Sequence, residues 1–199
     1  TQVLVTAPAS QLASAKDVVE RARAQPGMVP FGSAGSGTTS HLTMELFTQM
    51  SGISLSHVPY KGSSTSMIDV MAGRVPLMFD SLPGVLTNVK SGSLRAIAVA
   101  SAQRDPLLPN VPTVAESGVP GFATSGWIGL LAPARTPPQI VDQLHTAVAK
   151  ALKSEAVKKR MSELAFTPIG NSPAEFQTFL SKEVALWGGV AAKAGVQKE

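Results

Sequence analysis

A chain of 199 residues, 44% of them hydrophobic and 15% charged, is long enough to bury a core as one domain or two small ones. Its net charge of +4 comes from scattered lysines and arginines, which is weak support for nucleic-acid binding, and the lack of cysteine excludes disulfides, thiolate metal sites and cysteine catalysis. No apolar stretch reaches the length of a membrane span, and the first residues have the pattern of a strand rather than a signal peptide.

Strands and helices are predicted to alternate over the first half of the chain. Short apolar and β-branched runs predict the strands, and longer amphipathic runs between them predict the helices. The expected strands are residues 3–7, 28–33, 53–60, 75–81 and 94–101. The expected helices are residues 14–27, 39–52, 63–73 and 83–92. This alternation favours an α/β fold with a mainly parallel sheet and helices on both of its faces.

Local signals mark where these helices begin and end. Ser14 and Asp17 have the spacing of a capping box, Pro83 suits the first turn of a helix, and Gly52 stands where a C-terminal cap belongs. Residues one turn apart predict the inward faces of the second and third helices. These residues are Leu42, Leu46 and Met50 in the second helix, and Met67, Ile68 and Met71 in the third.

The pattern changes after about residue 101. Residues 103–121 are rich in proline and glycine, which predicts a crossing segment. Beyond it we expect strands over 127–133 and 166–170 and helices over 136–155, 156–165 and 172–195. Capping boxes are expected at Thr136 with Gln139 and at Ser172 with Glu175. The first of these helices carries an apolar stripe formed by Ile140, Leu144, Val148 and Leu152. So few strands predict part of a second lobe rather than an independent sheet.

A turn rich in glycine and hydroxyl side chains lies between the second strand and the second helix, in FGSAGSGTTSHL, residues 31–42. Gly32 and Gly37 have the spacing of a P-loop, but Thr38 stands where the phosphate-binding lysine is required. The dinucleotide fingerprint also fails, because Ser40 occupies the position of its last glycine. The Gly-x-Ser-x-Gly elbow of serine hydrolases is not matched either.

Two interpretations of this turn remain open. In the first, backbone N–H groups and the helix dipole bind one carboxylate, with hydroxyl donors from Ser33, Ser36, Thr38 and Thr39. In the second, the turn is a tight strand–helix connection with a hydroxyl cap and no ligand. The residues alone do not decide between them.

Polar residues also follow other expected strands. Ligands of parallel α/β sheets lie beyond the carboxyl ends of the strands, where this sequence places Gly32-Ser33, Tyr60-Lys61-Gly62 and Asp80-Ser81. Lys61 either pairs with an anionic ligand or is a solvated turn residue. Asp80 either binds a ligand amine or hydroxyl, or fixes its loop.

The histidines give no strong signal for chemistry. His41 and Glu45 share a helix face, which favours a surface pair or a capping contact over a catalytic dyad. His57 is interpreted as a structural residue of its strand. No two histidines have the spacing of metal ligands, so we expect no metal and no cofactor.

Four stretches together resemble a known family. In chain order they are FGSAGSGTTSHLTMELF, HVPYKGSSTSMIDVMAGRVPLMFDSLP, VKSGSLRAIAVASAQRDPLLPNVPTVAESGVPGF and WIGLLAPARTPPQIVDQL. They closely resemble the Bug family, the solute-binding proteins of tripartite tricarboxylate transporters, over essentially the whole chain. The resemblance implies a periplasmic-binding-protein fold, whose two α/β lobes close over a small organic acid. It also implies delivery of that carboxylate to a membrane permease, without catalysis and without nucleic acid.

The resemblance also predicts how the chain divides and where it binds. Residues 1–103 are similar to a nearly complete second lobe, 104–119 to the crossing segment, and 120–199 to the C-terminal part of the first lobe. Family members carry an export signal and the start of the first lobe before the part that matches here. We therefore expect a periplasmic protein represented by a truncated chain, with self-association through the incomplete lobe as a possibility. The expected ligand-binding residues are Ser33, Gly35, Ser36, Gly37, Thr38, Thr39, His41, Tyr60, Lys61, Gly62 and Asp80.

Two other classes of function remain as alternatives. The effector-binding domain of a transcription regulator can share this two-lobed fold, but a helix-turn-helix segment would have to lie outside this sequence. A hydrolase using Ser36 or Ser40 with His41 is disfavoured, because adjacent residues of a helix point in different directions.

Overall fold

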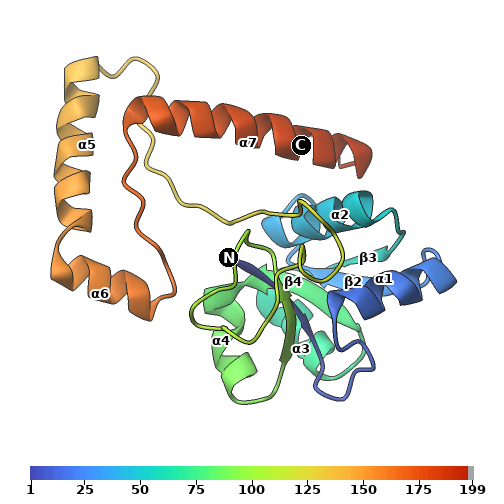
Figure 1. The fold of residues 1–199 in the computed structure, drawn as a ribbon. Helices are drawn as coiled ribbons and strands as arrows, with labels where there is room; N and C mark the ends of the chain where they lie inside the picture. Colours follow the sequence, from blue (N-terminus) through green and yellow to red (C-terminus); the bar gives the residue numbers. More distant parts are fainter. Residues whose placement is uncertain (197–199) are drawn as a thin grey trace. The chain divides into compact units, whose positions relative to one another are not determined.

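The computed structural model describes residues 1–196, which form two compact units. The sheet unit comprises Thr1–Gly126 and the C-terminal residues from Val190, and the helical unit comprises Trp127–Gly189 (Figure 1). The sheet unit therefore extends well beyond the expected boundary at residue 103. Over the described residues, no helix combines the length and the hydropathy needed to cross a membrane.

A mixed sheet of five strands forms the centre of the sheet unit (Figure 1). The strands are β1 Gln2–Thr6, β2 Pro30–Ser33, β3 Ser56–Pro59, β4 Leu77–Ser81 and β5 Arg95–Val99, in the spatial order β3-β2-β4-β1-β5. β2 runs parallel to β3 and β4, whereas β1 runs antiparallel to both β4 and β5. Four of the five strands therefore run in one direction, which confirms the expected mainly parallel sheet, and only β1 of these strands runs the other way. The alternation of elements along a sequence does not reveal this direction, because β1 pairs with two strands that come much later in the chain.

Helices cover both faces of the sheet, as expected. They are α1 Ala15–Ala24, α2 Thr39–Ser51, α3 Ser63–Met71 and α4 Leu82–Lys90. Neighbouring residues of β2 show the two faces: the Phe31 ring stacks toward His41 of α2, whereas Gly32 lies against Ser66 of α3. The capping box of Ser14 with Asp17 and the left-handed Gly52 cap are confirmed.

The predicted inward faces of α2 and α3 were partly wrong. In α2 the core side is formed by Met44 and Phe47, and Met50 is 42% exposed. In α3 Val70 is buried, whereas Ile68 is 54% exposed. An apolar spacing of one turn gives a period but does not say which of two neighbouring faces meets the sheet.

The segment after β5 belongs to the core of the sheet unit. Val114, Val119 and Phe122 are buried, and Val99 pairs with Thr113 as an isolated parallel bridge. The Phe122 ring lies 6.2 Å from Phe47 and 6.4 Å from Phe79 between ring centroids. The expected crossing segment, 104–119, therefore packs onto the sheet unit, because its apolar side chains complete that core.

The helical unit contains α5 Pro138–Leu152, α6 Glu155–Glu163 and most of α7 Pro173–Lys193. The expected strands over 127–133 and 166–170 do not form, and Ile128 and Leu130 are 81% and 75% exposed. A strand needs a pairing partner, and none of the described strands pairs with these residues. α5 likewise buries none of its predicted apolar stripe.

One of the two capping boxes expected in this unit is present. The Ser172 N–H donates to Glu175 at 2.8 Å, and the Glu175 N–H donates back to the Ser172 hydroxyl at 3.3 Å. The box of Thr136 with Gln139 is absent, because α5 begins one residue later than predicted, with Pro137 as its N-cap.

Substituting Gly32 by alanine is expected to lower the free energy of unfolding by about 1–3 kcal/mol, because the new methyl group would collide with Ser66 Oγ. That hydroxyl is buried and has no hydrogen-bond partner among the described residues, so Ser66→Ala alone should be close to neutral. Urea unfolding of both single variants and of the double variant measures the effect. If Gly32→Ala lowers the free energy of unfolding equally in wild type and in Ser66→Ala, the collision with the hydroxyl is not the cause.

Candidate functional site

The carboxyl ends of β2, β3 and β4 bring the predicted polar segments to one edge of the sheet, which we call the polar edge. Because β2 and β3 pair in parallel with Ser33 opposite Pro59, the glycine-rich turn and the segment from Tyr60 begin side by side. A Cβ on Gly35 would lie 3.3 Å from the Tyr60 carbonyl oxygen, so the two segments touch. Asp80 and Ser81 end β4, the next strand along.

A helix begins immediately after each of these segments. The N-cap residues of α2, α3 and α4 are Thr38, Gly62 and Ser81, and within residues 1–196 none of them makes a side-chain capping bond. In contrast, Ser14 caps α1 and Ser154 caps α6 through their hydroxyls. Three positive helix ends without capping side chains therefore meet at the polar edge, which favours a negatively charged ligand there.

Most backbone N–H groups of the glycine-rich turn are already used within the protein. The Gly35 N–H donates to Ser33 Oγ at 3.1 Å, and the Gly37 N–H donates to His41 Nδ1 at 3.1 Å. Two more N–H groups find acceptors: that of Ala34 donates to Ser40 Oγ at 2.9 Å and that of Thr38 to the Gly35 carbonyl at 3.3 Å.

The N–H groups of Ser36, Thr39, Ser40 and His41 have no acceptor within the described part of the chain. Ser36 and Thr39 are also exposed. These groups of the turn are free for a ligand in the observed conformation, although the residues Ser40 and His41 are buried.

Two of the predicted side chains have partners inside the protein. The Tyr60 hydroxyl donates to Asp69 Oδ2 at 2.6 Å, which raises the pKa of Tyr60, while Tyr60 and Arg74 together lower the pKa of Asp69. Asp80, 8% exposed, accepts a hydrogen bond from Ser63 Oγ and another from the Ser81 N–H at 2.7 Å. Asp80 therefore ties together the starts of α3 and α4, which supports the loop-fixing alternative.

Lys61 and Gly62 lie at the turn between β3 and α3. Lys61 is exposed, and no carboxylate of the described residues lies within ion-pair distance of it. Gly62 has a φ of 127°, a backbone conformation that favours glycine. The lysine thus places a positive charge at the polar edge without an internal partner.

Two histidines that are far apart in sequence stack under the glycine-rich turn. The rings of His41 and His57 lie 3.8 Å apart at 10°, and Phe31 lies 4.9 Å beyond His57. Ser33, fully buried, has its hydroxyl 2.6 Å from His57 Nε2. Glu45 Oε1 lies 3.5 Å from His41 Nε2. Sequence spacing related His41 to Glu45, but only the pairing of β2 with β3 brings His57 to this cluster.

Burial lowers the pKa of His57 to about 4, from an ordinary value of 6.5. This value includes the smaller effect of the neighbouring His41, which also lowers the pKa, and that of Glu45, which raises it. His57 is therefore neutral near neutral pH. Within the described residues, no cluster of ionisable side chains could hold a metal ion.

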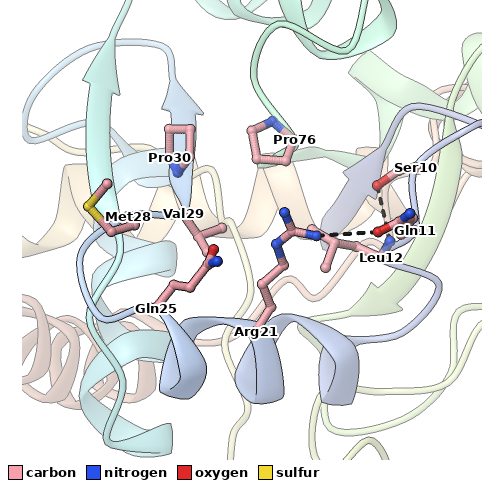
Figure 2. Close-up of a pocket in the computed structure, with 9 residues that line it drawn as sticks. All are labelled: Ser10, Gln11, Leu12, Arg21, Gln25, Met28, Val29, Pro30 and Pro76. Atoms are coloured by element: carbon pink, nitrogen blue, oxygen red, sulfur yellow. Dashed lines mark hydrogen bonds between the residues drawn. The ribbon is translucent and has the colours of Figure 1, made fainter.

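Two cavities formed by described residues of the sheet unit bear on the site. One, of about 680 Å³, is lined by Ser36, Gly37, Thr38, His41, Glu45, His57 and Ala194–Val196. The other, of about 280 Å³, lies at the opposite edge of the sheet, between Pro30 and Pro76 (Figure 2). Figure 2 shows that Arg21, the one charged residue lining the smaller cavity, reaches Gln11 with its guanidinium group. Because its one charged group already hydrogen-bonds to Gln11, the smaller cavity is a weaker candidate site for binding a carboxylate than the polar edge.

Comparison with known proteins identifies relatives along the whole described chain. A family described as "Tripartite tricarboxylate transporter family receptor" matches residues 1–196. Protein BugT of Bordetella pertussis is 35% identical over 195 residues, which are 98% of this chain and 60% of BugT.

Solved structures agree with this match. The structure described as R. palustris Rpa4515 with adipate has a TM-score of 0.85 and 38% identity, covering 98% of this chain and 65% of that one. MatC from Rhodopseudomonas palustris with bound malate has a TM-score of 0.81 and 26% identity, and the match covers 95% of this chain and 65% of MatC. The chain thus spans less than two thirds of the length of these relatives.

The stability of the protein is expected to fall as the pH decreases from about 6.5 to about 4 because of His57. In this window the unfolded chain binds a proton at His57 and the folded protein does not, so the unfolded state gains stability. Above the window His57 is neutral in both states and contributes nothing. Thermal unfolding of wild type and His57→Gln across the window isolates this effect from that of the carboxylates. An identical pH dependence in the two proteins would contradict it.

Proposed function

Because the chain belongs to the tripartite tricarboxylate transporter receptor family, we propose that it is part of a receptor that binds a small organic acid and delivers it to a membrane permease. The observation that carries this proposal is the meeting of three helix N-termini without capping side chains at the polar edge. The relatives bound to adipate and malate support a dicarboxylate as the class of ligand. The family is one of periplasmic solute-binding proteins, and we place this receptor in the same compartment.

The proposed contacts to a carboxylate are of two kinds. The N–H groups of Ser36, Thr39 and Ser40 donate hydrogen bonds, and Gly35, Gly37 and Gly62 allow the backbone to come close. The hydroxyls of Ser36 and Thr39 and the ammonium group of Lys61 complete the set. Thr38 holds the turn instead, because its hydroxyl donates to the Gly35 carbonyl at 2.6 Å.

The remaining predicted residues hold the segments of the polar edge in place and do not contact the ligand. Ser33, His41, Tyr60 and Asp80 each hydrogen-bond within the protein, and these bonds fix the three segments of the polar edge. No step of this function requires catalysis. Ser33 is fully buried, so its hydroxyl beside His57 is out of reach of a substrate.

We propose further that the sheet unit is one lobe of the receptor and the helical unit is part of the other. Support comes from residues 127–131, where Ile128, Leu130 and Leu131 are 74–81% exposed although the sequence predicts a strand there. In a receptor as long as the relatives, we expect additional chain to pair with this run. A second copy covering the same run is the alternative, and analytical ultracentrifugation distinguishes the two.

Lys61→Met is expected to weaken dicarboxylate binding by about tenfold, because a charge-assisted hydrogen bond to the ligand is lost. Isothermal titration with succinate, malate and adipate measures the affinity. Lys90→Met is the matched control, since Lys90 is also an exposed lysine. It lies in the last turn of α4, about 12 Å along the helix axis from the start of α4 at the polar edge. Equal effects of the two substitutions would contradict the assigned contact. If neither this chain nor a form extended to the length of its relatives binds any acid, the proposed function is wrong.

Amide hydrogen exchange tests the assignment of the lobes. The amides of Ile128 and Leu130 should exchange rapidly in this chain, since their residues form no strand. In the extended form they should become protected at least as well as the amides of β3. Exchange that remains rapid in the extended form would show that this run is not a strand of the completed lobe.

A further inference from the structure

The glycine-rich turn is held at both of its ends by the histidine stack. At its start, Ser33 Oγ lies 2.6 Å from His57 Nε2, and at its end the Gly37 N–H donates to His41 Nδ1 at 3.1 Å. The two rings lie 3.8 Å apart, so the two bonds are linked through direct ring contact. The stack therefore fixes the conformation of the segment in which the proposed ligand contacts lie.

The bond from Gly37 requires one particular proton arrangement on His41. Nδ1 can accept a hydrogen bond only when it carries no proton, so the neutral ring holds its proton on Nε2. Nε2 faces Glu45 Oε1 at 3.5 Å. A second proton on the ring would have to go to Nδ1, where it would face the Gly37 N–H and break the bond.

The charged and titratable groups around His41 come from few elements. Glu45 lies on its own helix, α2, and His57 faces it from β3. The residues that approach from the end of the chain, Ala194–Val196, have no ionisable side chain. Burial keeps His57 neutral well below neutral pH, so among residues 1–196 the Glu45 carboxylate is the group placed to balance a charge on His41.

We propose that His41 is a positioning residue that withholds the Gly37 N–H from the ligand while neutral and releases it when protonated. This inference rests on the proposed function. Protonation frees one backbone donor beside Ser36 and adds a positive charge under the turn, and both changes favour a carboxylate. His57 holds the ring of His41 in place by stacking. The receptor then binds its ligand more tightly in mild acid.

Two substitutions of His41 separate this role from a purely structural one. In His41→Asn the side-chain oxygen takes the place of Nδ1 and keeps accepting from Gly37, but it cannot be protonated. In His41→Leu the acceptor is lost and the Gly37 N–H is free at every pH. The matched control is His145→Asn, which removes a histidine from α5 in the helical unit.

Titration with adipate at about pH 8 and about pH 6, where the acid remains largely ionised, is the test. Wild type and His145→Asn should bind about two- to tenfold more tightly at the lower pH, the range expected for one freed hydrogen bond. His41→Asn should bind weakly and His41→Leu tightly, each with little dependence on pH. Melting temperatures recorded alongside identify any variant that fails to fold.

A second measurement needs no ligand. Nitrogen-15 spectra of the histidine rings in the free wild-type protein should show His41 protonated on Nε2 alone at about pH 8 and on both nitrogens after acidification. A proton on Nδ1 at about pH 8 would overturn the inference directly. So would an unchanged pH dependence of adipate binding in both His41 variants. Absence of binding by wild type, in this chain and in the extended form, would instead overturn the proposed function.

Discussion

The parallel pairing of β2 with β3 and β4 is the constraint on which the candidate site depends. Parallel strands end at the same edge of a sheet, so the segments that follow Ser33, Pro59 and Ser81 meet although they are distant in sequence. Each strand is followed by a helix, after a turn of five residues for β2, of three for β3 and of none for β4, so three positive helix ends lie at this edge. A single positive helix end is common, but three whose N-cap residues make no side-chain capping bond concentrate positive potential at one edge. The carboxyl group of Asp80 lies at the starts of α3 and α4, so this potential is least opposed at the start of α2.

Most polar groups of this edge serve its own architecture. Asp80 joins the starts of α3 and α4, and the Tyr60 hydroxyl bonds to Asp69 rather than facing outward. The histidine stack holds the two ends of the glycine-rich turn. The stack limits the conformations of this turn, whose glycines would otherwise leave its backbone free. The direct contacts are left to a few N–H groups and to Lys61.

The helical unit differs from the sheet unit in how it is stabilised. Its clearest tertiary contacts are aromatic: Trp127 lies 5.7 Å from Phe176 and 5.5 Å from Phe179 between ring centroids. Trp127 also donates to Glu183 at 2.9 Å. Yet α5 and α6 bury no residue completely, and the run from Ile128 to Leu131 remains exposed. Over residues 127–189 no strand forms, so no sheet covers the apolar sides of these helices.

Sequence alone determined the local features of this protein. The capping boxes at Ser14 and Ser172, the Gly52 cap and the strand–helix alternation depend on neighbouring residues, and the family could be identified from contiguous motifs. Only the tertiary structure decided the features that depend on long-range pairing. The reversed direction of β1 and the burial of Phe122 beside Phe47 are two such features. The contact of His57 with Ser33 is another, because strand pairing brings together residues that no local pattern relates.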